Sequence, residues 1–225
     1  MLERDKLEKV GLEAISLKVS RGRNKVSYIV TDLQEAIRNQ EDNERYIIDI
    51  FIDILGIEEG TGEEISIGKL EGNFFESEFV MEDTDFYEIC DCAGRDLEPL
   101  AAAIVDKDRC IKEHICEFHK NIIYIDRIYV EEKYRNIGIA SFVIESISEL
   151  LKYTVNLNSH TLILLPKPQE KNEQGGLCNI EEKQEKEICM KKLINLYKRL
   201  GFKKIRNSNY MIKKQTYVDS IKRIL

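Results

Sequence analysis

Residues 121–140 read Asn121-Ile-Ile-Tyr-Ile-Asp-Arg-Ile-Tyr-Val-Glu-Glu-Lys-Tyr-Arg-Asn-Ile-Gly-Ile-Ala140. The first half is rich in β-branched and aromatic residues, and it is the strongest strand signal in the chain. Residues 139–153 then show the spacing of an amphipathic helix. Unpaired N–H groups at a helix N-terminus bind anions, and Gly138 and Ala140 permit close approach, so this junction suits a pyrophosphate. Taken alone, the same spacing is equally compatible with plain packing.

Two motifs carry a resemblance to a known family. Arg135, Gly138 and Ala140 match motif A of the GCN5-related N-acetyltransferase (GNAT) superfamily, which is Arg or Gln, two residues, Gly, one residue, then Gly or Ala. Residues 196–202, Leu-Tyr-Lys-Arg-Leu-Gly-Phe, resemble motif B of the same family. The motifs stand in the family's order, and the resemblance covers residues 120–214.

The resemblance implies a fold. It is an α/β (α+β) fold with a mixed central sheet of six to seven strands, splayed at the fourth and fifth strands and flanked by helices on both faces. We expect one domain over residues 1–225. Within it, residues 1–119 form the variable half, residues 120–214 carry the motifs, and residues 215–225 form a tail.

The resemblance also implies acetyl-CoA as co-substrate. In the family, the strand before the loop offers backbone groups to the pantetheine arm, and the loop and helix start hold the pyrophosphate. The strand positions here are Ile128, Tyr129 and Val130. The loop and helix positions are Arg135, Asn136, Ile137, Gly138, Ile139, Ala140 and Ser141.

The family's amine acceptor attacks the thioester directly, with a base taking the amine's proton and an acid protonating the thiolate. Tyr197 matches the frequent acid position, and a phenol with a pKa of about 10 suits that role; the alternative is a core tyrosine. Family members often carry Glu near the position of Tyr124, so the base is open between Asp126 and Tyr124. A salt bridge is the alternative role for Asp126.

Side-chain alternation predicts that Tyr124, Asp126, Ile128 and Val130 share one strand face. A second departure from the family concerns the helix of motif B. Met190 and Leu193 stand where many members carry Asn and Ala. Coenzyme binding is therefore better supported than catalysis.

Local patterns predict the remaining elements. Strands are expected at residues 14–20 and 25–31, joined as a hairpin, at 46–55 before a break at Gly56, Gly60 and Gly62, at 65–67 and 73–81, and at 161–165. Helices are expected at residues 32–43, at 87–105 with an interruption at Pro99, at 108–118 and at 187–200. A hairpin over residues 202–213 and a short terminal helix complete the chain, and residues 166–185 are expected to be a mobile loop.

The net charge of −7 is unevenly distributed. Residues 58–98 hold 14 Asp and Glu against 2 Lys and Arg, whereas residues 186–225 hold 2 against 12. An acidic stretch attracts a cationic substrate, and a basic end suits phosphates or another anion. Solvated faces are the plainer interpretation of both.

Several classes of function are disfavoured. No stretch approaches the roughly 20 apolar residues of a membrane helix, so we expect a cytoplasmic protein without a membrane partner. The six cysteines suggest reduced thiols. Cys110, His114, Cys116 and His119 face opposite ways on a continuous helix, so we expect no metal site.

We therefore expect an N-acyltransferase, and favour an N-acetyltransferase that moves an acetyl group from acetyl-CoA to a primary amine; a longer acyl group is the alternative. The acceptor is open among a small amine, a protein N-terminus or lysine, and an aminoacyl-tRNA; apart from such a tRNA we expect no nucleic-acid partner. A homodimer is compatible with the sequence. The alternative is a catalytically silent GNAT-like module that binds a coenzyme or a protein partner in a regulatory role.

Overall fold

The computed structural model describes residues 4–22, 46–76, 85–92, 97–116, 120–171, 177–180 and 182–215. The strands are β1 (Leu12–Gly22), β2 (Ile47–Glu58), β3 (Glu64–Phe75), β4 (Ile122–Val130), β5 (Thr161–Leu164), β6 (Gln169–Lys171), β7 (Leu177–Asn179), β8 (Lys203–Lys204) and β9 (Met211–Lys214). The helices are α1 (Arg4–Glu8), α3 (Phe86–Cys92), α4 (Glu98–Ile104), the short 3-10 helix η3 (Glu132–Tyr134), α5 (Ile139–Val155) and α6 (Lys183–Arg199).

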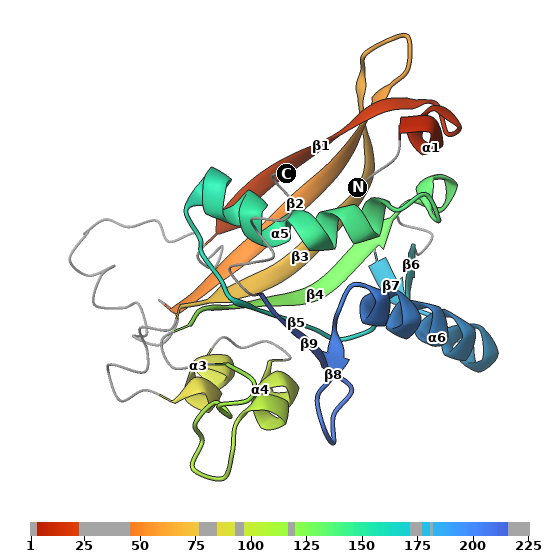
Figure 1. The fold of residues 1–225 in the computed structure, drawn as a ribbon. Coiled ribbons are helices and arrows are strands. Elements are labelled where there is room, and N and C mark those ends of the chain that lie inside the picture. Colours follow the sequence, from red (N-terminus) through yellow and green to blue (C-terminus); the bar gives the residue numbers. More distant parts are fainter. Residues whose placement is uncertain are drawn as a thin grey trace, which may run out of the picture.

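Seven strands form one mixed sheet in the order β1-β2-β3-β4-β5-β9-β8 (Figure 1). Strands β1 to β4 are antiparallel neighbours, β5 lies parallel to β4, and β9 returns antiparallel to β5. The parallel pair needs a crossover, which α5 supplies. Strands β6 and β7 pair separately as a small hairpin.

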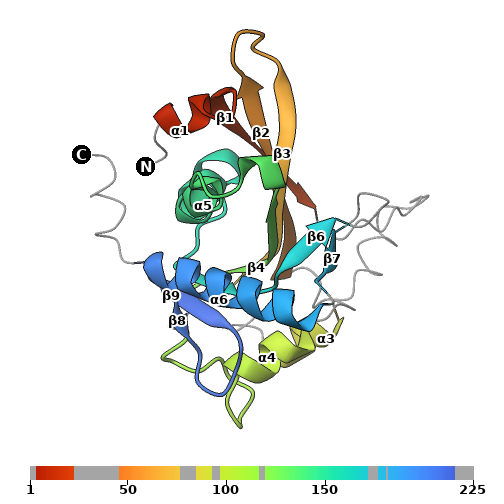
Figure 2. The ribbon, with the colours of Figure 1, turned by 90° about the vertical axis from the view of Figure 1, so that its right-hand side faces the viewer.

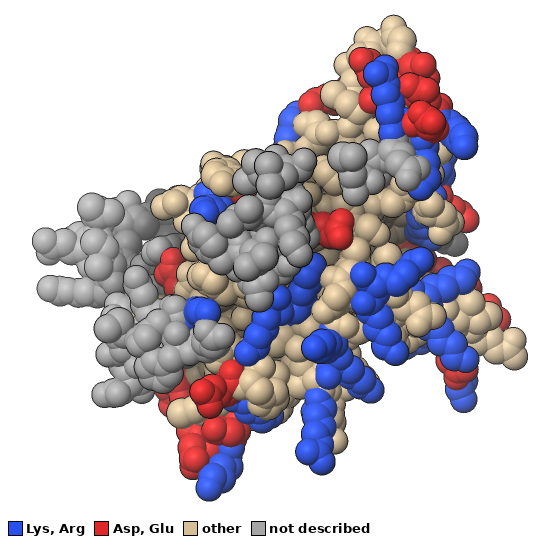
Figure 3. All heavy atoms as spheres, in the orientation of Figure 1, with Lys and Arg blue, Asp and Glu red and all other residues tan. Residues whose placement is uncertain are grey.

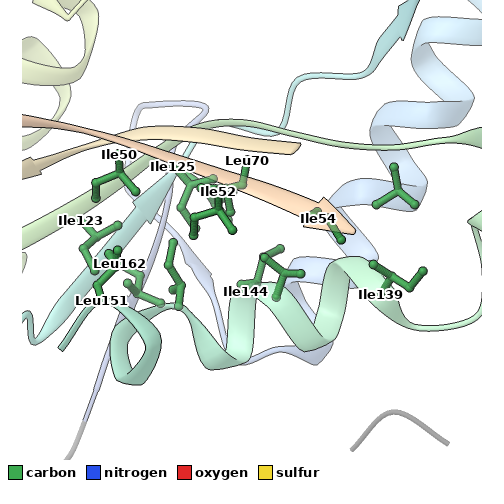
Figure 4. Close-up of a cluster of buried hydrophobic side chains, with 14 of the residues drawn as sticks. Ile50, Ile52, Ile54, Leu70, Ile123, Ile125, Ile139, Ile144, Leu151 and Leu162 are labelled. Atoms are coloured by element: carbon green, nitrogen blue, oxygen red, sulfur yellow. The ribbon is translucent and has the colours of Figure 1, made fainter. Parts of the chain in front are cut away.

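Alternating isoleucines place β2 in the middle of the core. Ile50, Ile52 and Ile54 are completely buried and point toward α5, where Ile139 and Ile144 meet them (Figure 4). Helix α5 thus covers one face of the sheet (Figure 2). Helices α3 and α4 lie against the other face, where Leu100, Ile104 and Phe86 form a second core with Phe75, Ile122, Tyr124 and Ile163. The sheet is therefore covered by helices on both faces, as expected.

Strong local patterns predicted the central elements correctly. The strands at β2, β4 and β5, the helices α5 and α6, and the β8–β9 hairpin all lie where they were expected. Pro99 stands in the first turn of α4, so the interruption predicted there is real. The elements predicted over residues 25–43 and 216–225 lie outside the described residues.

Other predictions were wrong. Residues 108–116 form turns and a bridge from Val105 to Ile111 instead of a helix. The Asp106 carboxylate accepts the backbone N–H groups of Asp108 and Cys110, and side-chain bonds of this kind compete with helical ones. Strand β2 continues through Gly56, β3 is one strand rather than two, and β6 and β7 lie within the predicted loop.

Candidate active site

Strands β4 and β5 are paired over only half of β4. Ile122 to Ile125 pair with Thr161 to Leu164, where β5 ends. In the pairing of β4 with β3, Gly72 opposes Ile125 and Glu71 opposes Arg127, so Asp126 is an extra residue. A bulge bends a strand and increases its twist. Beyond Asp126, β4 diverges from β5, and no described strand pairs with that edge of residues 126–130 (Figure 1).

The bulge overturns the predicted strand face. Ile128 and Val130 pack in the core under α5 together with Ile125, whereas Tyr124 packs on the opposite side of the sheet. One extra residue reverses the alternation of all side chains that follow it. Asp126 therefore lies at the point of reversal, and Tyr124 does not share a face with Ile128 and Val130.

The loop between β4 and α5 has an unusual backbone. Asn136 and Gly138 both lie in the left-handed region, with φ values of 64° and 101°, and Gly138 is the residue that caps α5. Asn and Gly are the residues that tolerate this region best. The first N–H groups of α5, on Ile139, Ala140 and Ser141, have no acceptor within the helix. These groups and the positive end of the helix dipole suit an anion.

The diverging parallel strands and the helix N-terminus beside the end of β4 are the arrangement that motif A implied. The seven-stranded mixed sheet, with its parallel β4–β5 pair and flanking helices, is consistent with the GNAT fold. The order of elements from β4 to β9 is strand, helix, strand, helix and hairpin, with the small β6–β7 hairpin inserted before α6.

No family model matches the sequence, and no curated protein is similar to it. Similar solved structures include a KacTA–DNA complex, at 9% identity over 93% of this chain and 100% of that chain with a TM-score of 0.41. AtaT complexed with acetyl-methionyl-tRNAfMet matches at 15% identity over 93% and 99%, with a TM-score of 0.36. Arabidopsis thaliana NAA60 with a bisubstrate analogue matches at 16% over 75% and 76%, with a TM-score of 0.35.

Arg135 links the loop before α5 to strand β4. Its Nε donates a 2.8 Å hydrogen bond to the carbonyl oxygen of Val130, and its guanidinium carbon lies 5.3 Å from the centre of the Tyr129 ring. The Tyr129 hydroxyl in turn lies 3.3 Å from Oε2 of Glu131. Arg135 is exposed, and no carboxylate among the described residues forms an ion pair with it. Its positive charge therefore adds to that of the helix N-terminus.

Tyr197 lies in the last turns of α6. It is the only buried residue among those of α6, with 4% of its surface exposed, and its ring centroid lies 6.0 Å from that of Phe202. Burial raises the pKa of Tyr197 to about 12, so the phenol is protonated at neutral pH. Its hydroxyl makes no hydrogen bond to a described residue. The group can therefore donate a proton to a bound molecule.

Tyr124 is a poor candidate for the base. It is 3% exposed, and its ring lies 6.1 Å from that of Tyr210. Burial, and then the nearby Asp126 carboxylate, hold the pKa of Tyr124 far above its usual range. The hydroxyl donates to Asp126 Oδ1 at 3.4 Å. A neutral phenol cannot take a proton from an amine, which leaves Asp126 as the candidate.

Asp126 belongs to a row of alternating charges that the sequence did not reveal. Arg127 lies 2.8 Å from Asp126 Oδ2 and 3.4 Å from Glu71, and Lys167 lies 3.7 Å from Asp126 Oδ1. Lys69 extends the row with a 2.7 Å contact to Glu71. These residues come from β3, β4 and the segment after β5, so only the strand register brings them together. Neither the composition nor the spacing of residues in the sequence indicated this row of charges.

The cysteines and histidines weighed for a metal do not converge. Cys110 and His114 are exposed, whereas Cys116 is buried and its thiol contacts the Lys120 carbonyl oxygen. His119 lies outside the described residues. Within the part of the chain that the structure describes, no three His, Cys, Asp or Glu side chains could hold a metal ion. In the same part, no helix is long and apolar enough to cross a membrane.

Proposed function

We propose that this protein transfers an acetyl group from acetyl-CoA to a primary amine. The observation that carries the proposal is the opening of β4 from β5 at Asp126, beside the N-terminus of α5, where no side chain caps the first N–H groups. A strand edge with unpaired backbone groups suits the amide-bearing pantetheine arm, and the helix N-terminus suits the pyrophosphate. One molecule that carries both groups, joined in that order, is coenzyme A.

The coenzyme is bound mainly by the backbone. Residues 128–130 offer the open edge of β4 to the pantetheine amides, and the N–H groups from Asn136 to Ser141 surround the pyrophosphate. Arg135 contributes a charge while its Nε bond holds the loop against Val130.

The chemistry needs one proton donor and one route for a proton to leave. The neutral amine attacks the thioester carbonyl, the carbon–sulfur bond breaks, and the Tyr197 hydroxyl gives its proton to the departing thiolate. The amine's proton passes through water to the Asp126 carboxylate. Each positioned proton transfer contributes roughly 10²–10⁴ in rate. Arg127 and Lys167 keep Asp126 at the mouth of the opening.

Ser141 offers the sharpest test of the coenzyme site. Ser141→Glu places a carboxylate in the first turn of α5, where it favours the helix but repels a pyrophosphate. Calorimetric titration with acetyl-CoA should show at least a tenfold loss of affinity, while the melting temperature stays the same or rises. Ser141→Gln, of matched shape and no charge, should bind within about threefold of wild type. Equal affinity of the Glu variant would place the coenzyme elsewhere.

A catalytically silent coenzyme-binding module is the second candidate. The contacts of Asp126 favour this candidate. Its carboxylate already lies beside two cations and accepts a hydrogen bond from the Tyr124 hydroxyl, so it has partners within the protein. A free-thiol release assay over a panel of small amines, peptides and aminoacylated RNA separates the two candidates. Binding without thiol release on any acceptor supports the silent module, and release above the hydrolysis background supports the transferase.

A further inference from the structure

One segment of the chain, from the middle of α6 to the end of β9, carries many cations and no anions. Residues 188–215 contain nine Lys and Arg and no Asp or Glu. Eight of the nine are exposed, and we call them the basic face: Lys191, Lys192, Lys198, Arg199, Lys203, Lys204, Arg206 and Lys214. Figure 3 shows Lys and Arg side chains gathered over α6 and the β8–β9 hairpin.

The described acidic residues do not neutralise the charge of the basic face. None of its eight residues forms an ion pair with a described Asp or Glu. Elsewhere in the described chain the contrast is clear, since Lys69, Arg127 and Lys167 all contact carboxylates. Like charges that are left together repel one another, and an external polyanion relieves that repulsion.

The cations on α6 form two pairs on one side of the helix. Lys191 and Lys192 stand seven residues before Lys198 and Arg199, which is about two turns and 10.5 Å along the axis. Leu193, Leu196 and Leu200 lie on the other side, against the core. The row continues from the end of α6 into β8 through Lys203 and Lys204. An extended row of this kind matches a chain of phosphates better than a single anionic group.

Coenzyme A does not account for the whole basic face. Its three phosphates are grouped at one end of the molecule, and the proposed pyrophosphate site is at the N-terminus of α5. Eight unpaired cations spread over α6, β8, the following turn and β9 exceed what those phosphates could neutralise. The acidic stretch of residues 58–98 also confines a polyanion to the basic face, because it repels one elsewhere.

We propose that the basic face binds the sugar-phosphate backbone of an RNA that carries the acceptor amine. This inference rests on the proposed acetyl transfer. The amines of nucleobases are conjugated with their rings and are poor nucleophiles, whereas an amino acid esterified to RNA presents an aliphatic amine next to a phosphate chain. Tyr197 lies on the inner side of the helix whose outer side carries Lys198 and Arg199. The end of an RNA bound outside needs to pass only one helix diameter, about 10 Å, to reach the phenol.

Binding is measured without acetyl-CoA, so that it does not depend on the proposed reaction. Fluorescence anisotropy with labelled bulk tRNA should give an affinity that falls steeply with salt, with a slope of about 0.7–0.9 per phosphate contact. Lys203→Glu/Lys204→Glu should weaken binding at least tenfold at 100 mM salt and lower the slope by about 2. Lys9→Glu/Lys107→Glu changes two exposed lysines outside the basic face and alters the net charge equally. This control should stay within about threefold of wild type.

Three results would overturn the inference: no tRNA binding at 100 mM salt, equal losses in both double variants, or equally tight binding of a poly-glutamate peptide. The last result would identify an acidic protein surface as the partner. Titration of the wild-type protein with acetyl-CoA tests the proposed function separately. If the protein binds acetyl-CoA but no RNA, only the RNA inference is overturned, and the proposed acetyl transfer is not.

Discussion

Arg135 Nε lies 2.8 Å from the carbonyl oxygen of Val130, so the first residue of the loop before α5 is held by the last residue of β4. The same guanidinium lies over the Tyr129 ring. These two contacts of Arg135 link the loop to the open strand. In the proposed complex, the two parts of the coenzyme site are connected by this one side chain.

Arg135→Ala should lower acetyl-CoA affinity about tenfold, because it removes a hydrogen bond to a backbone carbonyl and a charge close to the pyrophosphate. Arg135→Lys keeps the charge but not the planar guanidinium, so its acetyl-CoA affinity should lie between those of wild type and Arg135→Ala. Calorimetry measures the affinities. Arg4→Ala, which removes an exposed arginine from α1, is the control and should bind as wild type. An unchanged affinity for Arg135→Ala would remove the residue from the site.

Tyr197→Phe should lower kcat by one to three orders of magnitude, because the thiolate then leaves without a positioned acid. The affinity for acetyl-CoA should change little, since the ring and its packing on Phe202 are kept. A stopped assay with the best acceptor measures kcat, and calorimetry measures the affinity for acetyl-CoA. Tyr153→Phe alters a tyrosine that is 76% exposed and should be neutral. If both variants turn over at the wild-type rate, another group protonates the sulfur.

The raised pKa of Tyr197 also predicts how stability depends on alkaline pH. The folded protein holds this proton up to a pKa of about 12, whereas the unfolded chain releases it near the ordinary value of 10.0. The contribution to stability is therefore complete below pH 10 and is lost as the pH rises toward 12. Between these pH values, the free energy of unfolding of Tyr197→Phe should therefore fall by about 2–3 kcal/mol less than that of wild type. Urea unfolding of both proteins at pH 9, 10.5 and 11.5 measures this difference. Equal losses of stability in wild type and Tyr197→Phe would contradict the prediction.

Gly72→Ala should disturb the site from a neighbouring strand. A methyl group at Gly72 would collide with the Tyr124 carbonyl oxygen and lie 3.3 Å from the Ile125 Cα. Because the obstacle is backbone, β4 must move, at a cost of about 1–3 kcal/mol. Acetyl-CoA affinity should fall with the melting temperature. At Gly56 the methyl meets the Leu12 and Ile67 side chains, far from the bulge, so Gly56→Ala should lower stability without a further loss of affinity.

Asp126→Asn should lower kcat roughly 10- to 100-fold if the amine's proton passes to this carboxylate through water. Lys167→Met removes the cation at 3.7 Å and should change kcat less than threefold, because a long, partly exposed ion pair contributes little. Rates at saturating acetyl-CoA and acceptor provide the comparison. A larger effect of Lys167→Met than of Asp126→Asn would make Lys167, and not the carboxylate, the important group.

Local sequence predicted the elements whose signals are local. The β-branched run before Val130 forms β4, the amphipathic spacing after Gly138 forms α5, and Gly201 separates α6 from the final hairpin. Motif A also predicted where β4 and β5 diverge. The helix expected over residues 108–118 was wrong because one carboxylate, that of Asp106, binds two backbone N–H groups there.

The sequence by itself determined the strand, loop and helix of residues 121–155, because propensity, side-chain spacing and the left-handed positions of Asn136 and Gly138 act within a few residues. Only the tertiary structure decided what Asp126 contacts. Its bulge depends on the register between β4 and β3, a strand about fifty residues earlier, and on the lack of a side chain at Gly72. That register reverses the strand faces, separates Tyr124 from Ile128, and brings Arg127 and Lys167 to the carboxylate.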